Sequence, residues 1–295
     1  MGFGSYSVSD RSERSTSRGY ATKSAHEIFT QRSINNAMNP NGVRLRESRD
    51  SEEHPSSVPI IVALDVTGSM GSVPHHLVKE GLPKMMSGIM QAGIPDPQVL
   101  FLAIGDHECD RSPLQVGQFE SNDELLDKWL TDVFLEGGGG GNAGESYFLA
   151  WYFAAQRTAH DAFDKRGQKG FLFTIGDEPT LKSLPKNVVR EIMGDGQYDD
   201  YTAASLLDAA REKYHVYHLH IRETHSGSRK EVMEGWRQLM QDNLVIVDRK
   251  EDVSRIIAEI IVKNTPVSGA KPIDEQSDNV AETGSTGSVA SDEML

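Results

Sequence analysis

The sequence predicts an α/β fold built on a mostly parallel sheet. Short apolar runs, rich in β-branched and aromatic residues, alternate along the chain with segments of helical hydrophobic spacing, which is typical of strands covered by helices. The runs that predict parallel strands are residues 59–64, 99–104, 170–175, 214–221 and 244–247. A sixth run, 113–119, follows the second strand after eight residues. So short a link suits a hairpin, so we expect an antiparallel edge strand there.

Three segments between or after these strands have the apolar spacing of helices. Residues 73–90 have this spacing, although Pro83 is expected to kink the helix. A second stripe covers 232–240, and apolar residues at 253, 256, 257, 260 and 261 define the clearest helix in the chain. We therefore predict a doubly wound, six-stranded sheet with helices on both faces.

Composition divides the 295 residues into three parts. Residues 1–57 are dense in Ser, Arg, Asn and Gly, which predicts a flexible N-terminal arm with one short helix near 26–34. Residues 265–295 have six acids and one Lys, which predicts a disordered acidic tail. The remaining segment, 58–264, is long enough for one domain with a real core, and it has 31 acidic against 21 basic side chains.

The overall composition excludes several classes of protein. With 44 acidic and 30 basic residues the net charge is −14, which disfavours a nucleic-acid binder. The longest apolar run, 60–64, is far shorter than the roughly 20 residues that span a bilayer, so no membrane association is expected. The single cysteine, Cys109, cannot form an internal disulfide, and no apolar run near the N-terminus suits a signal peptide. A cytoplasmic protein is therefore expected.

Oxygen-bearing side chains cluster where two predicted strands end. Asp65, Thr67 and Ser69 follow the first strand, and Asp177 follows the strand at 170–175. In a doubly wound sheet the carboxyl ends of the strands line the ligand crevice. A Gly-rich loop at 137–146 lies between them in the sequence and offers Asn142 as a further oxygen ligand. Such a set suits a hard cation, with Mg²⁺ first and Mn²⁺ or Ca²⁺ as alternatives.

These motifs together resemble a von Willebrand factor A domain with its metal-ion-dependent adhesion site. The resemblance rests on the sequence DVTGSM at 65–70, the Gly-rich loop with its Glu-Ser pair, and Gly176-Asp177, and it covers the whole of 58–264. It implies a Rossmann-like fold and a divalent ion held by Asp65, Thr67, Ser69 and Asp177. The second-loop ligand of the family is usually Thr, sometimes an acid, and this loop offers Asn142 or water in its place.

The resemblance also implies a function. A protein partner would complete the ion's coordination with an Asp or Glu side chain, which makes the chain a non-enzymatic, metal-dependent protein-interaction module. Soluble microbial relatives often work beside ATPase chaperones, and a compact domain without disulfides suits a bacterium or a phage. Two alternatives remain. One is a metal-dependent phosphoryl-transfer or hydrolase enzyme that uses Asp65 as nucleophile, although Thr67 stands where a proton-donating acid is needed. The other is a structural subunit of an assembly with an empty metal site.

The same residues also allow interpretations without a metal ion. Asp-x-Thr-Gly-Ser after a strand is often only a capped turn, and Glu145 is expected to favour the start of a helix. Gly139, Gly141 and Gly144 match a dinucleotide fingerprint, with Asp161 or Asp164 about 20 residues on, but the segment before them is too short and acidic for its first strand.

A zinc site is a further alternative. Residues 107–110 (HECD) and three histidines on one predicted strand, His215, His218 and His220, are possible ligands by residue type. Adjacent residues on one loop rarely all reach one ion, and a core histidine is commoner.

Overall fold

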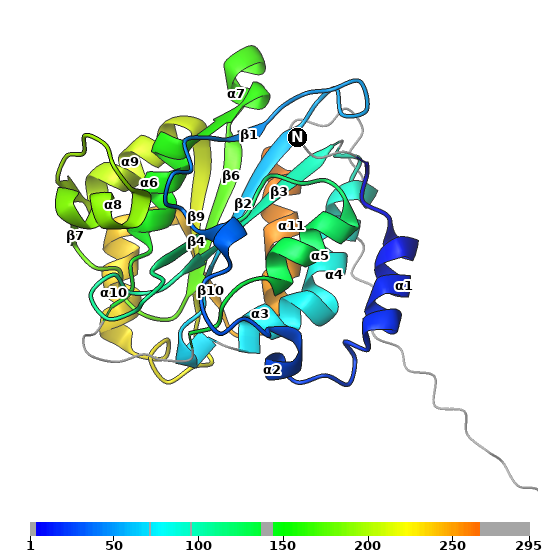
Figure 1. Ribbon diagram of the computed structural model, residues 1–295, viewed down its shortest axis with the longest axis horizontal. Coiled ribbons are helices and arrows are strands. Elements are labelled where there is room, and N and C mark those ends of the chain that lie inside the picture. The colour runs from blue at the N-terminus through cyan, green and yellow to red at the C-terminus, as the bar shows by residue number, and fades with distance from the viewer. Residues whose placement is uncertain (1–3, 71, 95, 137–143, 266–295) are drawn as a thin grey trace, which may run out of the picture.

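A six-stranded sheet forms the centre of the protein (Figure 1). The computed structural model describes residues 4–70, 72–94, 96–136 and 144–265. The strand order is β10-β9-β6-β2-β3-β4. The strands of this sheet are β2 (Val58–Asp65), β3 (Pro97–Ile104), β4 (Leu114–Val116), β6 (Gly170–Gly176), β9 (Tyr214–Ile221) and β10 (Leu244–Val247).

All pairs in this sheet are parallel except one. Strand β2 pairs with β3 on one side and with β6 on the other, both in parallel. Strand β4 runs antiparallel to β3 at the edge, with Val116 opposite Leu102. The predicted fold class is therefore confirmed, including its antiparallel edge strand.

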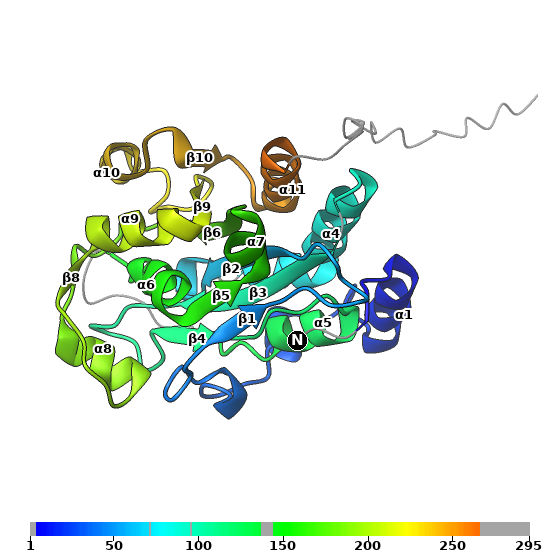
Figure 2. The same cartoon turned by 90° about the horizontal axis from the view of Figure 1, so that it is seen from above.

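Helices cover both faces of the sheet (Figure 2). They are α1 (Val8–Arg18), α2 (Ala25–Ile28), α3 (Ser72–His76), α4 (Leu82–Gln91), α5 (Asp123–Thr131), α6 (Phe148–Arg157), α7 (Asp161–Arg166), α8 (Lys186–Met193), α9 (Ala203–Lys213), α10 (Lys230–Met240) and α11 (Val253–Asn264). Single 3₁₀ turns lie at Asn36–Met38, Gly68–Met70, Gln241–Asn243 and Lys250–Asp252.

The side chains of β2 point alternately to the two faces of the sheet, and each face carries its own hydrophobic core. Ile60, Val62 and Leu64 pack with α3, α4, α5 and α11, whereas Ile61 and Ala63 pack with α6, α9 and α10. Successive strand residues point to opposite faces, so a strand that is apolar throughout must be covered on both.

Two further sheets have two strands each: β1 (Arg46–Ser48) pairs with β5 (Thr158–His160), and β7 (Ser183–Leu184) pairs with β8 (Tyr201–Thr202).

The helix expected over 73–90 is interrupted before Pro83. Helix α3 ends at His76, a π-helical turn covers Leu77–Gly81, and α4 begins with Pro83 in its first turn. Proline has no backbone N–H, so the carbonyl four residues earlier loses its helical partner and the turn before it widens.

The N-terminal segment differs from its prediction. Residues 4–57 are not a free arm but lie against the domain, and α1 was not expected. Tyr6, Tyr20, Phe29 and Met38 are buried. The composition was misleading because it treats the arginines of this segment as solvated, whereas Arg11, Arg14 and Arg18 form ion pairs with acidic residues of α5.

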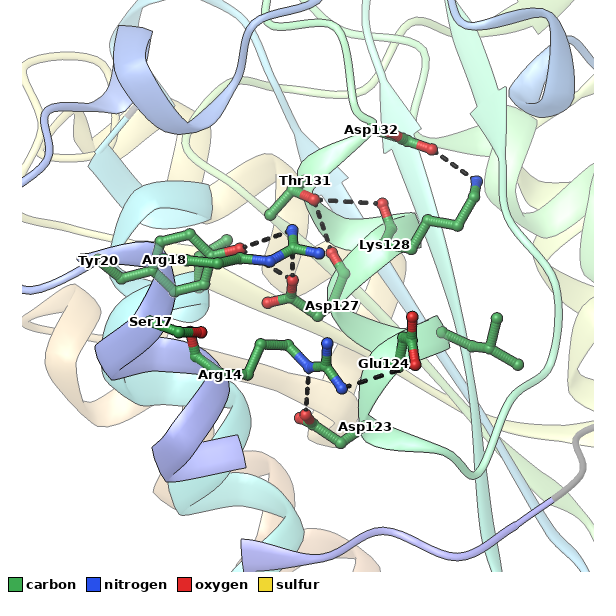
Figure 3. A network of polar contacts seen from close by, with 12 residues as sticks. Arg14, Ser17, Arg18, Tyr20, Asp123, Glu124, Asp127, Lys128, Thr131 and Asp132 are labelled. Carbon is green, nitrogen blue, oxygen red and sulfur yellow. Dashed lines mark hydrogen bonds and ion pairs between the residues drawn. The ribbon is translucent and has the colours of Figure 1, made fainter. Parts of the chain in front are cut away.

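Figure 3 shows these contacts between the N-terminal segment and α5. The Arg14 Nε donates to Asp123 Oδ2 at 2.8 Å, and the Tyr20 hydroxyl donates to Asp127 Oδ2 at 2.8 Å. Arg18 also forms an ion pair with Asp127, with 3.0 Å between the charged atoms. Arg11, 1% exposed, forms a further ion pair with Asp127. Together these contacts hold α1 on the surface of α5.

The predicted acidic tail, 265–295, lies outside the described residues apart from Thr265. Across the described part of the chain, no helix has the length and apolar character needed to cross a membrane.

Candidate functional site

The carboxyl ends of β2 and β6 bring Asp65 and Asp177 to one edge of the sheet. Leu64 pairs with Ile175, so Asp65 ends its strand beside Gly176, and Asp177 follows directly. Both side chains are fully buried, and the charge of Asp177 contributes to raising the pKa of Asp65. Two of the predicted site residues therefore lie close together, as the parallel topology requires.

Asp65 accepts three hydrogen bonds from the described residues. Its Oδ1 accepts from the backbone N–H of Thr67 at 2.9 Å and from the Thr67 hydroxyl at 2.6 Å. Its Oδ2 accepts from the Tyr147 hydroxyl at 2.7 Å. The bonds to Thr67 form the capped turn that the residue types favour. Because the Thr67 proton is donated to Asp65, the hydroxyl oxygen retains lone pairs that can bind a cation.

The two remaining predicted ligands are less defined. Ser69 lies in the 3₁₀ turn Gly68–Met70, directly after Thr67 and Gly68, which places its backbone at the same edge. Asn142 lies outside the described residues.

Glu145, which the sequence predicts to favour the start of a helix, lies three residues before α6 and at the same edge of the sheet. Its backbone N–H donates to the Pro179 carbonyl at 2.9 Å, and its own carbonyl accepts from Leu181 at 3.0 Å. These bonds attach it to the loop that follows Asp177. The next residue, Ser146, donates its N–H to the Gly105 carbonyl after β3 at 3.2 Å. The backbone of Glu145 is therefore held between the segments that follow β3 and β6.

The Glu145 carboxylate is 7% exposed, and its Oε2 has no hydrogen-bond partner within the described residues. Burial raises its pKa to about 10, with further contributions from the charges of Asp65, Asp110, Asp106 and Glu178. Burial also raises the pKa of Asp65 to about 7, against the opposing effect of its hydrogen bonds. Acidic groups are thus concentrated at this edge, and a bound cation would stabilise them in their charged form.

Tyr147 lies among these carboxylates and is itself fully buried. Burial raises the pKa of its hydroxyl well above the usual value, and the charges of Asp65, Asp177 and Glu145 act in the same direction. Its hydroxyl therefore stays protonated and acts as a donor. The sequence pattern of oxygen-bearing residues at strand ends does not include this tyrosine. Its contact with Asp65 depends on how the start of α6 packs against the sheet.

A cavity of about 350 Å³ lies beside the loop that follows β3. It is lined by His107 and Asp110 of the loop after β3, by Asn39 and Asn41 of the N-terminal segment, and by Ile192 of α8, among others. The Ser146 Oγ accepts from the His107 backbone N–H at 3.0 Å and lies 2.8 Å from its ring Nδ1. This contact links the cavity wall to the segment that holds Glu145.

The predicted zinc alternatives do not converge on one ion. His218 stacks on Trp236 with ring centroids 3.5 Å apart, and its Nδ1 lies 2.9 Å from the Thr174 hydroxyl. The His220 Nε2 contacts the Gly227 carbonyl at 2.9 Å, whereas His215 packs beside Phe171. His218 and His220 are buried and His215 packs on an aromatic ring, and the described residues show no common point that the three share.

The dinucleotide alternative is not supported by its acidic residues. Asp161 and Asp164 each accept from Arg49 Nη1 at 2.8 Å, and Asp161 follows β5, away from the site. Gly139 and Gly141 lie outside the described residues.

Two features decide whether a divalent ion fits. In the described residues, no group of three or more His, Cys, Asp or Glu side chains is placed to hold an ion. A magnesium site, however, commonly has only one or two carboxylates and retains water. Oxygen-only donors, a hydroxyl at Thr67 and a buried Glu145 oxygen that has no partner among the described residues fit an ion of this kind.

Comparisons with known proteins give only distant similarities. No protein-family profile matches the sequence, and no curated protein matches it. Among solved structures, the chain is similar to the pilus adhesin SpaC from Lactobacillus rhamnosus GG in its open conformation, with a TM-score of 0.47 and 16% identity. The similarity covers 74% of this chain and 31% of the adhesin.

A second structure of the same adhesin gives a TM-score of 0.46 and 15% identity over 74% of this chain and 32% of that one. Proximal thread matrix protein 1 from the mussel byssus gives 0.43 and 12% identity, over 72% of this chain and 49% of the matrix protein. The similarity thus spans between 31% and 49% of the length of these proteins. The similarities say nothing about what it binds.

Proposed function

We propose that this protein is a non-enzymatic module that binds a protein partner through a divalent cation, Mg²⁺ first, at the carboxyl edge of its sheet. The observation that carries the proposal is Glu145, a buried carboxylate with an oxygen that no donor reaches within the described residues. A buried acid without a partner is costly unless it binds a cation or a proton.

Four side chains with described surroundings would hold the cation: Asp65, Thr67, Asp177 and Glu145. Ser69 and Asn142 are proposed with them from the sequence. Some of these side chains would act through bound water, because within the described residues no three acids are placed to hold one ion together. When bound, the ion offers an open coordination position to an Asp or Glu of a partner.

The chain's own residues explain why a cation would be needed. Asp106, Asp110 and Glu178 add negative charge near Glu145, and of these Glu178 forms an ion pair with Arg229 at 2.6 Å. An incoming carboxylate is repelled by such an edge unless a cation reverses the local field. The burial of Asp65 and its three hydrogen bonds weigh against its use as a nucleophile.

Isothermal titration with Mg²⁺ and Mn²⁺ tests the proposal. We expect saturable binding to the wild type, with affinity reduced at least tenfold in Glu145→Gln and Asp177→Asn, which keep the side-chain shape and remove the charge. Asp208→Asn is the matched control, because that carboxylate is 77% exposed on α9. No saturable binding at millimolar metal, or equal binding by all variants, would contradict the proposal.

The partner interaction is tested separately. A partner captured by the full chain in Mg²⁺ should be released by a chelator and should not be captured by Glu145→Gln. Retention of the partner in chelator would instead favour a structural subunit whose interface does not use a metal.

A further inference from the structure

The Tyr147 hydroxyl is the one described side-chain donor to the second oxygen of Asp65, at 2.7 Å. An ionised carboxylate has about four acceptor positions. Thr67 fills two with its N–H and hydroxyl, both on Oδ1, and Tyr147 fills a third on Oδ2. The donors of the described residues thus leave one acceptor position on Oδ2, and the hydrogen bond from Tyr147 constrains the direction in which it points.

The ring of Tyr147 is held rigidly. It packs edge-on against His218 and Trp236, with ring centroids 5.2 and 5.4 Å away. On the remaining side it lies against Gly176, where a Cβ atom would come within 1.8 Å of the hydroxyl oxygen. The hydroxyl thus occupies a space that exists because residue 176 has no side chain, and it cannot move away from Asp65 without repacking two aromatic contacts.

We infer that Tyr147 is a positioning residue of the cation site. It locks the Asp65 carboxylate so that its last acceptor position serves the cation or a water molecule bound to it. This inference rests on the proposed function, since it assigns a role within the same site. Hydrogen bonds of this kind behind a metal ligand typically change metal affinity by about 10- to 100-fold when they are removed.

The test is the Mn²⁺ affinity of Tyr147→Phe, measured by isothermal titration. We expect it to be weakened about tenfold or more. Tyr214→Phe is the matched control, because Tyr214 is also buried and its hydroxyl lies 2.6 Å from that of Thr158, at the opposite end of the sheet. This control should lose similar thermal stability and keep the wild-type affinity. Equal affinity in Tyr147→Phe and wild type, or equal weakening in both variants, would overturn the inference.

A double-mutant cycle with Asp65→Asn separates positioning from a general effect on packing. If Tyr147 acts through Asp65, Tyr147→Phe should cause little further loss of affinity in the Asp65→Asn background. Full additivity would overturn the inference and leave the proposed function standing. If the wild type binds no Mn²⁺, the proposed function fails first and the positioning role fails with it.

Discussion

At the residue scale, Gly176 shows how one position constrains the site. A methyl group there would overlap the Tyr147 hydroxyl, so we expect Gly176→Ala to lower the free energy of unfolding by about 3 kcal/mol or more. Gly235→Ala is the control, because that helical glycine in α10 has open space around its Cβ position and should be neutral or slightly stabilising. Urea denaturation of both variants checks the prediction. Equal effects would contradict the close approach.

His160 gives a second prediction at this scale. Its Nδ1 accepts from the Phe163 N–H at 3.1 Å and caps α7, and burial lowers its pKa to about 4. The unfolded chain therefore binds more protons between pH 6.5 and 4, so stability contributed by the neutral ring is present above pH 6.5 and is lost as the pH falls. This group alone should account for about 2 kcal/mol of the loss between pH 8 and pH 5.

The replacement His160→Asn keeps a capping oxygen and removes the titration. Urea denaturation at pH 8 and pH 5 should show a smaller drop in unfolding free energy for the variant than for the wild type. Identical drops would mean that His160 is not neutral in the fold. Buried His218 also has a lowered pKa, so part of the pH dependence should remain in both proteins.

At the element scale, α1 depends on charges that it meets on α5. Arg11→Met should lower the unfolding free energy by about 3 kcal/mol, because it leaves a buried acidic cluster with one cation fewer. Arg255→Met is the control: this arginine is 54% exposed on α11, and its two ion pairs should contribute less than about 1 kcal/mol. Denaturation measures both, and limited proteolysis within α1 should be faster only in Arg11→Met.

The elements also show what the sequence could and could not predict. The strands of the sheet follow from their apolar runs, and the antiparallel β4 follows from the short link before it. The docking of α1 could not be predicted, because Arg11 and Asp127 are 116 residues apart and composition treats both as solvent-exposed. The placement of Asp65 and Asp177 at one edge could be predicted because strand ends are predictable, whereas the positions of Glu145 and Tyr147 depend on the path of the chain before α6.

At the scale of the whole molecule, excess negative charge and a local acidic edge predict different responses to salt. Any cation screens a net charge of −14 and so changes the stability of the fold. A specific site, in contrast, stabilises the fold at low concentrations of a divalent ion. At a hundredfold excess over Kd, Mn²⁺ should raise Tm by about 5 to 10 °C above a NaCl solution of equal ionic strength. Glu145→Gln should lose that difference. An equal rise in both salts would indicate general screening.

The central claim is that a divalent cation binds where β2 and β6 end. Anomalous diffraction from crystals grown with Mn²⁺ tests it most directly, because the method locates the ion. We predict one strong peak within about 2.0 to 2.6 Å of an oxygen of Thr67, Asp177 or Glu145. A well-ordered site without a peak at saturating Mn²⁺, or peaks only at exposed surface carboxylates, would contradict the claim.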